Sequence, residues 1–489
     1  MIVMGALVGI SLFEIAARAI RIQLALTVIN NFERYIFAHG EATNDADRQK
    51  AITNAALCLC IIIFLVSAGF GVAALLFIAP AMVFTLSNQE FLFYSLATLI
   101  SLPYIKLRPS IWRFFKKNQA TNFSNLPAGG SRSRYPFASR LLHWLILEPE
   151  PVRKISFWIE TIYVTWFTSA GKQRLADNAP VYVCGLARSG TTIVLDVLHK
   201  TGVFASTSYA DMPFVLAPNL WKSITVSAKG SGRKLERAHA DGLLIDQSSP
   251  ESFEEVFWRT YTERNSGPGL GYCSPTATTL EKFKRYQELV IFSKSAAFGH
   301  NNSLRYLSKN NNNVLRLEVL LEDLKARAVI VVRDPLATAW SLFKQHKRFC
   351  DLFSDDHFDL AYLRWLGHHE FGAGHLPFDF SVEALRSLKP LEPNYWLQYW
   401  ISVYDRLVHV ATNPRVCVVV HDHLCADSIN QIDRILQFLD IVAYPQNLAT
   451  MVNTTNRNHQ VIDQYFDPNL AKYSADLFEK IISLSTKKY

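Results

Sequence analysis

Residues Val181–Gly202 read VYVCGLARSGTTIVLDVLHKTG, and this stretch decides the fold. A short β-branched and apolar run leads into a glycine-containing turn, and the apolar spacing after the turn is typical of a helix. Such a strand, loop and helix directs backbone N–H groups and the positive end of the helix dipole at an anion. Gly185 and Gly190 permit the tight turn and a close approach of the backbone to that anion. The stretch therefore predicts a site for a phosphate or a sulfate.

The loop departs from a nucleoside triphosphate loop at one position. Its spacing of Gly185, four residues, Gly190, Thr191 and Thr192 matches that loop, but Thr191 stands where the triphosphate loop requires lysine. Arg188 lies inside the loop instead, where its guanidinium could reach an anionic oxygen, and the two threonines add hydroxyl donors. This pattern favours a donor substrate other than ATP.

The segment GLARSGTT resembles the 5′-phosphosulfate loop of the sulfotransferases that use 3′-phosphoadenosine 5′-phosphosulfate (PAPS), especially the arginine-containing form of tyrosylprotein sulfotransferases and their bacterial relatives. A second signature lies downstream, where the apolar run ARAVIVV is followed by Arg333 and, eight residues later, by Ser341. In that family an arginine and a serine at this separation bind the 3′-phosphate. The resemblance implies PAPS as donor, no metal, and a donor-binding set of Gly185, Arg188, Ser189, Gly190, Thr191, Thr192, Arg333 and Ser341.

The resemblance also suggests catalytic residues. Arg188 would stabilise the charge that develops on the leaving 5′-phosphate. Lys309 resembles a lysine placed before the middle strand of these enzymes, where it would contact the transferred group, although a solvated lysine in a polar loop is the alternative. A hydroxyl acceptor needs a base, and Asp211 is the leading candidate because it lies near the position of a catalytic glutamate in the tyrosylprotein relatives. Asp211 could instead cap a turn, and other candidates for the base are Glu254, Glu255, His368, His369 and Glu370.

The fold class follows from three strand candidates, at 181–185, 329–333 and 416–421, which alternate with long helical stretches. This alternation predicts an α/β, P-loop-like three-layer domain with a central parallel sheet over residues 176–489. Ligands bind such sheets at the carboxyl ends of the strands, where both anion signatures begin. Only Arg457 could replace the Arg-Lys-Gly loop with which cytosolic sulfotransferases bind their nucleotide.

The N-terminal part has a different character. Residues 51–89 carry no charge, which predicts a membrane-spanning helix, and a second apolar run at 91–105 could return as a helical hairpin. We therefore expect an amphipathic segment at 1–50, a transmembrane region of one or two helices at 51–107, and a basic linker and helix at 108–175. Tryptophans in that helix would pack on the catalytic domain or lie at the membrane interface. Basic residues flank the apolar region on both sides, which predicts a membrane localisation with the catalytic domain in the cytosol.

Charge and cysteines limit the function classes. The net charge of +8 arises entirely between Phe91 and Leu147, which hold eight basic residues and no acidic one. The excess is local, so the chain lacks the character of a nucleic-acid-binding domain. The seven cysteines are scattered and form no CxxC pair, which is typical of a reducing compartment and gives no zinc motif.

The acceptor and two rival functions stay open. The expected membrane anchor favours a lipid or lipid-linked glycan as the hydroxyl acceptor, with a protein tyrosine or a soluble carbohydrate as alternatives. A small-molecule kinase on the same loop architecture would need a loop lysine, which is absent, and an acidic Mg²⁺ ligand, which Asp334 could imitate. A catalytically inactive membrane scaffold is the other alternative, although the loop glycines, Arg188 and Ser341 are all present.

Overall fold

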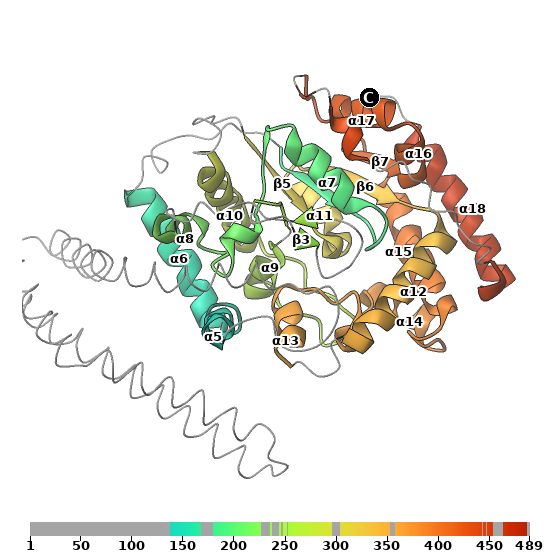
Figure 1. The fold of residues 1–489 in the computed structure, drawn as a ribbon, viewed down its shortest axis with the longest axis horizontal. Coiled ribbons are helices and arrows are strands. Elements are labelled where there is room, and N and C mark those ends of the chain that lie inside the picture. Colours follow the sequence, from blue (N-terminus) through green and yellow to red (C-terminus); the bar gives the residue numbers. More distant parts are fainter. Residues whose placement is uncertain are drawn as a thin grey trace, which may run out of the picture. The chain divides into compact units, whose positions relative to one another are not determined.

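Five parallel strands form the centre of the fold in the computed structural model (Figure 1). Their order is β2-β5-β1-β6-β7, with bounds Phe204–Ala205, Arg305–Lys309, Val181–Cys184, Arg327–Val332 and Val416–Val420. The structure describes residues 137–167, 179–225, 235–236, 244–245, 248–251, 253–295, 304–352, 357–442, 444–445, 447–452 and 463–486. A two-stranded antiparallel ribbon, β3 (Leu235–Glu236) with β4 (Leu244–Ile245), lies outside the central sheet.

Helices connect and cover these strands. Their bounds are α5 Phe137–Leu147, α6 Glu150–Phe167, α7 Thr191–Lys200, α8 Pro218–Thr225, α9 Glu255–Tyr261, α10 Ala277–Ser295, α11 Leu317–Asp323, α12 Pro335–Leu352, α13 His357–Trp365, α14 Val382–Leu385, α15 Pro393–Val410, α16 His421–Ala426, α17 Ser428–Phe438 and α18 Pro468–Ser485. In this described part of the chain, no helix is both long and apolar enough to cross a bilayer. The amphipathic segment expected at 1–50 and the membrane hairpin expected at 51–107 lie outside the described residues.

The sheet separates two apolar layers because successive side chains of a strand point to opposite faces. Val181 and Val183 pack with α7 and α17 on one face. Tyr182 joins a cluster with α9 and α10 on the other face, where Cys184 packs with the aromatic residues of α15. Because helices cover both faces, the strands are apolar throughout, as expected for a buried parallel sheet. The expected α/β architecture with a central parallel sheet is therefore confirmed.

The three strands expected from the sequence are present as β1, β6 and β7, but β2 and β5 were not predicted. β2 is only two residues long, and β5 reads RYLSK, in which charged residues at both ends hide the apolar centre. β5 pairs with β1 on the side opposite to β6, with Val181 beside Leu307 and Val183 beside Lys309. β1 is therefore the middle strand, and the loop that follows it lies between the ends of β5 and β6.

Helices α5 and α6 pack on the domain that follows them. Phe157 and Val164 join the same apolar cluster as α9 and α10, and the Arg153 guanidinium donates to Thr260 Oγ1 at 2.8 Å and to the Leu147 carbonyl. The Glu160 carboxylate accepts from the backbone N–H groups of Asn219 and Leu220 at the start of α8. Helices α5 and α6 therefore pack against the domain that follows them, and the boundary at 176 stays a prediction.

Candidate donor and acceptor site

The loop after β1 has the form expected for an anion site. Ser189 is buried, and its Oγ donates to the Leu186 carbonyl at 2.7 Å, which closes the turn. α7 then begins at Thr191, with Gly190 as its N-cap and no side chain capping the helix start. The first backbone N–H groups of α7 are therefore not capped by a side chain and can donate to an anion.

Two glycines of this loop are required by their surroundings. Gly185 has φ +147°, and a Cβ placed on it would lie 2.4 Å from the Val331 carbonyl oxygen of β6. Gly190 has φ +98°, and its Cβ would lie 2.4 Å from Cδ2 of His421 in α16. Any other residue would strain the backbone and collide with a neighbour. The loop can therefore lie between β6 and α16 only with glycine at both positions.

Arg188 joins the two anion signatures. Its φ of 70° is in the left-handed region, which a non-glycine residue rarely adopts and which is common at functional sites. Its Nε donates to Ser341 Oγ in α12 at 3.1 Å. The resemblance places these two residues at opposite ends of one nucleotide, whereas in the structure they are in contact. The two anion sites therefore adjoin, and Ser341 orients the Arg188 guanidinium.

Arg333 has a buried donor that fits an anionic ligand. It follows the last residue of β6, and among the described residues its buried Nε has no hydrogen-bond partner. A buried and unsatisfied guanidinium N–H is costly unless a ligand or water occupies it. The neighbouring Asp422 accepts from the Asp334 backbone N–H at 3.2 Å. Burial would raise the pKa of Asp422, but contact with His421 and Asp334 and the charge of Arg333 outweigh burial and lower it.

Asp334 has a structural use. Its Oδ1 accepts from the Ala337 backbone N–H at 2.7 Å and so caps the start of α12. The kinase alternative required this residue as a metal ligand, and the cap gives it a different function. Together with Thr191 at the lysine position, this weakens the kinase interpretation.

Lys309 lies close to the loop, although not where the sequence placed it. It is the last residue of β5 rather than part of a polar loop, and it pairs in register with Val183, two residues before Gly185. Burial would raise the pKa of Glu370, but the contact with His368 and, more weakly, the charge of Lys309 outweigh burial and lower it. Lys309 is therefore next to the strand that leads into the loop, and its charge reaches a histidine–carboxylate pair.

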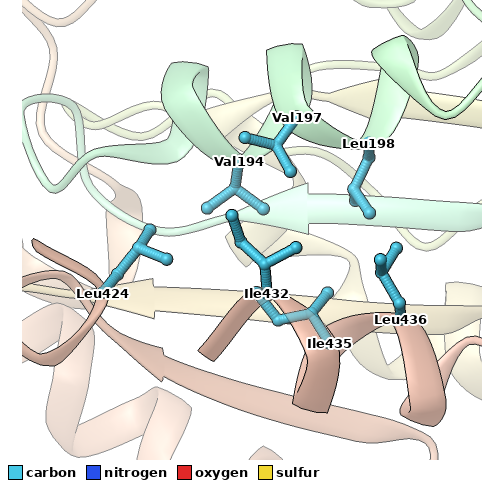
Figure 2. Close-up of a pocket in the computed structure, with 7 residues that line it drawn as sticks. All are labelled: Val194, Val197, Leu198, Leu424, Ile432, Ile435 and Leu436. Carbon is cyan, nitrogen blue, oxygen red and sulfur yellow. The ribbon is translucent and has the colours of Figure 1, made fainter. Parts of the chain in front are cut away.

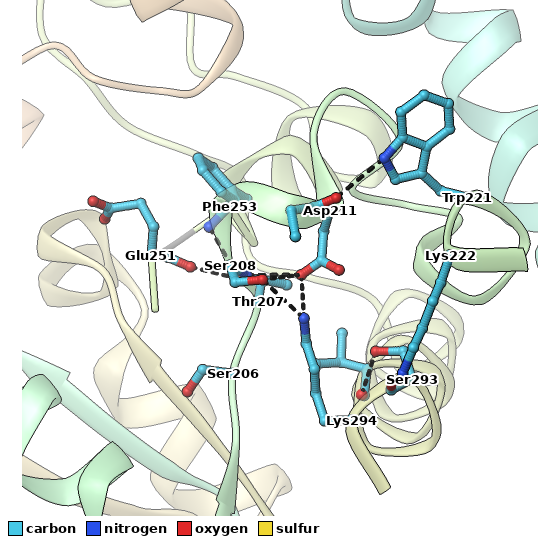
Figure 3. A network of polar contacts seen from close by, with 12 residues as sticks. Ser206, Thr207, Ser208, Asp211, Trp221, Lys222, Glu251, Phe253, Ser293 and Lys294 are labelled. Carbon is cyan, nitrogen blue, oxygen red and sulfur yellow. Dashed lines mark hydrogen bonds and ion pairs between the residues drawn. The ribbon is translucent and has the colours of Figure 1, made fainter. Parts of the chain in front are cut away.

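Asp211 is held in a turn beside the end of β2 (Figure 3). Its Oδ2 accepts from the backbone N–H of Ser208 at 2.7 Å and from Lys294 Nζ at 2.6 Å, and the residue is buried. The capping function, which the sequence left as an alternative, is the one that these contacts describe. No contact described by the structure joins Asp211 to the loop after β1, and its function as a base stays a prediction.

Glu254 and Glu255 are structural groups. Glu255 accepts from both terminal nitrogens of Arg316 at 2.9 Å and is 1% exposed. Glu254 is fully buried and accepts from Tyr306 and Asn313. Because both carboxylates are enclosed and paired, neither can meet an acceptor.

Four consecutive asparagines, Asn310–Asn313, hold the end of β5 to the rest of this region. Each is buried, and each side-chain amide donates to a different group: Glu255, Glu370, the Gly367 carbonyl and Glu254. The alternative of a solvated Lys309 in a polar loop placed this stretch in solvent, whereas all four asparagines are buried. No local sequence signal marks this burial, because the partners of the amides lie far along the chain. The candidate Arg457 and the other residues at 453–462 lie outside the described residues.

Comparisons with known proteins identify a family and several similar structures. The family model described as sulfotransferase domain matches residues 178–460, which is more than half of the chain. No curated protein matches the sequence significantly. Similar solved structures include sulfotransferase STF9 from Mycobacterium avium (14% identity, 70% of this chain and 86% of that chain, TM-score 0.38). Others are STF1 from Mycobacterium tuberculosis H37Rv (11% identity, 71% and 87%, 0.37) and mouse SULT7A1 complexed with PAP (12% identity, 64% and 88%, 0.29).

Proposed function

The chain belongs to the sulfotransferase family, whose members take a sulfuryl group from PAPS, and we propose that it is a membrane-anchored member that passes this group to a hydroxyl acceptor. The observation that carries the donor assignment is Arg333, whose buried Nε has no partner among the described residues. The contact between Arg188 and Ser341 adds a second cationic group at the same edge of the sheet.

The donor site can be divided by function. Ser189, Gly190, Thr191 and Thr192 would hold the 5′-phosphosulfate with their backbone N–H groups, since Gly190 precedes the first turn of α7. Arg333 and Ser341 would hold the 3′-phosphate. Arg188 would stabilise the negative charge that develops on the leaving 5′-phosphate, because a positioned guanidinium stabilises such charge most when water is excluded. Lys309, at the end of the neighbouring strand β5, would contact the sulfuryl group.

The proposed membrane anchor is supported by sequence and by the surface of α6. Residues 51–89 are free of charge and long enough to span a bilayer. On α6, Ile155, Trp158 and Trp166 are 53%, 59% and 67% exposed, one or more helical turns apart. Of the two positions considered for the tryptophans, this exposure favours the membrane interface, where tryptophan is enriched. A lipid or a lipid-linked glycan is therefore the proposed acceptor class, and the catalytic domain is proposed to lie in the cytosol with its PAPS.

Binding of the product nucleotide 3′-phosphoadenosine 5′-phosphate (PAP) tests the donor assignment. We expect the full chain in detergent micelles to bind PAP by calorimetry at least about tenfold more tightly than adenosine 5′-phosphate or ATP, because each lost charged contact costs about 1.5–3 kcal/mol. Arg333→Ala should abolish that preference, whereas the matched variant Arg386→Ala, at an exposed position directly after α14, should keep it. Preference for ATP would instead support the kinase.

The acceptor class can be tested with labelled donor. Membrane lipids of the source cells, incubated with radiolabelled PAPS and the full chain, should yield labelled lipid that is absent with Arg188→Ala. Label only in protein or soluble carbohydrate would contradict the lipid assignment and leave the donor assignment intact.

A further inference from the structure

The loop from Gly367 to Glu370 is fixed to the end of β5. The Asn312 amide donates to the Gly367 carbonyl at 2.8 Å, and the Asn311 amide donates to Glu370 Oε1 at 3.1 Å. Gly367 has φ +73°, and a Cβ there would lie 2.1 Å from Cγ of Glu255, so the loop packs directly on α9. The backbone from Gly367 to Glu370, which carries His368, is therefore fixed from two sides, by the asparagines after β5 and by α9.

His368 lies on this fixed loop and forms a pair with Glu370. Its Nδ1 is 3.6 Å from Glu370 Oε2, and the two side chains are 29% and 22% exposed. Burial alone would lower the pKa of His368, but Glu370 and, more weakly, Glu251 outweigh burial and the charge of Lys309, so the pKa is raised from 6.5. A carboxylate at Nδ1 orients the ring and leaves Nε2 to exchange a proton.

The pair adjoins the carboxyl end of β5, since the Asn311 amide, two residues after Lys309, donates to Glu370. Lys309 ends β5 in register with Val183, and its charge acts on both His368 and Glu370. Lys309 is thus next to β1 through its backbone and near the His368 pair through its charge. Close by, Oδ1 of the buried Asn311 has no hydrogen-bond partner in the described structure. A buried acceptor atom of this kind is suited to a donor group of a ligand, such as a hydroxyl.

We propose that His368, oriented by Glu370, removes the proton of the acceptor hydroxyl, a role that rests on the sulfuryl transfer proposed above. As the acceptor oxygen forms its bond to sulfur, the bond from sulfur to the 5′-phosphate oxygen breaks. The acceptor proton passes to Nε2 of His368 and then to water, and the products are the sulfate ester and PAP. Glu370 acts as a positioning residue because it touches the imidazole and not the acceptor.

The other acidic groups fit this function less well. Asp211 is bound in its turn and paired with Lys294, while Glu254 and Glu255 are enclosed. Glu251 accepts from the Tyr209 hydroxyl at 2.9 Å, and its charge also acts on His368. Glu251 is therefore the competing base, and it enters the test as such.

The test compares His368→Asn with the same change at an exposed histidine outside the site, His409→Asn in α15. Activity is measured on the full chain with PAPS and two probe acceptors, para-cresol and para-nitrophenol, and with water as a third acceptor through release of inorganic sulfate. We expect His368→Asn to lower kcat for para-cresol by about 10²–10⁴-fold, the usual contribution of a general base. The loss should be much smaller for para-nitrophenol, which ionises near neutral pH without a base. His409→Asn should keep kcat within about threefold of the wild type, because a threefold change in kcat corresponds to only about 0.6 kcal/mol.

The pH dependence of kcat separates a base from a merely structural residue. The groups that act on His368 are Glu370 on its own loop, Glu251 before α9 and Lys309 on β5. In the wild type, kcat should rise with pH through a pKa above 6.5, because His368 must be neutral to accept a proton. Glu370→Gln should move this rise to lower pH, since it removes the main group that raises the pKa of His368.

Each outcome decides one question. Wild-type kcat for para-cresol in His368→Asn, or its loss in Glu251→Gln alone, would overturn the role of His368. Failure of the wild type to bind PAP would instead overturn the proposed function. PAP binding by His368→Asn within about twofold of the wild type excludes a folding defect as the cause of lost activity, and loss of PAP binding in that variant alone would overturn the proposal by giving His368 a structural role.

Discussion

Gly190 has the most demanding position in the donor site. Its φ of +98° and the nearness of the His421 ring both exclude a side chain. We expect Gly190→Ala to lower PAP affinity at least about tenfold, because the left-handed backbone costs an alanine about 1–2 kcal/mol and the ring must also move. Gly202→Ala is the control, since Gly202 has φ +77° with no atom within 4 Å of its Cβ position. Equal PAP affinity in the two variants, by calorimetry, would contradict the close approach.

A substitution at Asp211 tests whether this residue caps its turn or acts as the general base. Asp211→Asn keeps an oxygen for the Ser208 N–H but loses the ion pair with Lys294. We expect a loss of about 1–3 kcal/mol in the free energy of unfolding, typical of a weakened buried polar contact, with kcat for para-cresol within about threefold. Urea unfolding and the kcat assay give the two values. A kcat loss of more than about 10²-fold without lost stability would restore Asp211 as the base.

The residues that the sequence could identify are those fixed by local spacing. Gly185, Arg188 and Gly190 stand in one loop, and Arg333 with Ser341 in one strand-to-helix turn, so a short pattern reveals them. The contact of Arg188 with Ser341 and the partners of Asn310–Asn313 depend on chain segments far apart in the sequence. Such pairings follow from the order of strands in the sheet, which local periodicity does not contain.

Helices α7 and α17 meet over one face of the sheet through an apolar pocket lined by Val194, Val197, Leu198, Leu424, Ile432, Ile435 and Leu436 (Figure 2). This pocket is lined by aliphatic side chains and lies apart from the donor residues, which makes it a packing feature of the two helices. The packing of these side chains holds α7, and therefore the anion loop that precedes it, against α17.

Ile435→Ala tests that packing. Ile435 is 2% exposed, so we expect a loss of about 2–5 kcal/mol in the free energy of unfolding from lost burial and the cavity left behind. Ile429→Ala is the matched control on the same helix, because Ile429 is 64% exposed and should change stability by less than about 0.5 kcal/mol. Urea unfolding of both variants gives the comparison, and similar losses would show that α17 is not held by its apolar face.

The strands show how far the fold could be predicted. β1, β6 and β7 are apolar throughout and were predicted, because a strand buried on both faces gives a continuous apolar run. β2 and β5 were missed for physical reasons. β2 has two residues, and β5 carries charge at both ends, where Arg305 reaches the backbone carbonyls of Ala179 and Leu439 and Lys309 lies in register with Val183. The sequence therefore predicts the sheet from β1 to its β7 edge, but not the two strands on the other side of β1.

At the scale of the whole molecule, the chain divides into two compact units, Met1–Lys117 and Asn118–Tyr489. The basic surplus spans the junction, since five of its eight residues precede Asn118 and three follow it. Outside this stretch acidic and basic residues are equal in number. An anionic surface would therefore attract the junction rather than the catalytic unit as a whole, and each basic residue near such a surface contributes about 1 kcal/mol.

Removal of the first unit tests the proposed anchor. We expect full-length protein to stay in the membrane fraction after washing with alkaline carbonate and with high salt, because a spanning apolar segment does not depend on charge. Protein beginning at Asn118 should leave that fraction in high salt, which screens the attraction of Arg132, Arg134 and Arg140 to anionic lipid. It should still bind PAP, since all proposed donor-binding residues lie in the second unit. Release of the full-length protein by carbonate would contradict a spanning anchor and leave surface attachment through the basic junction and α6 as the means of membrane association.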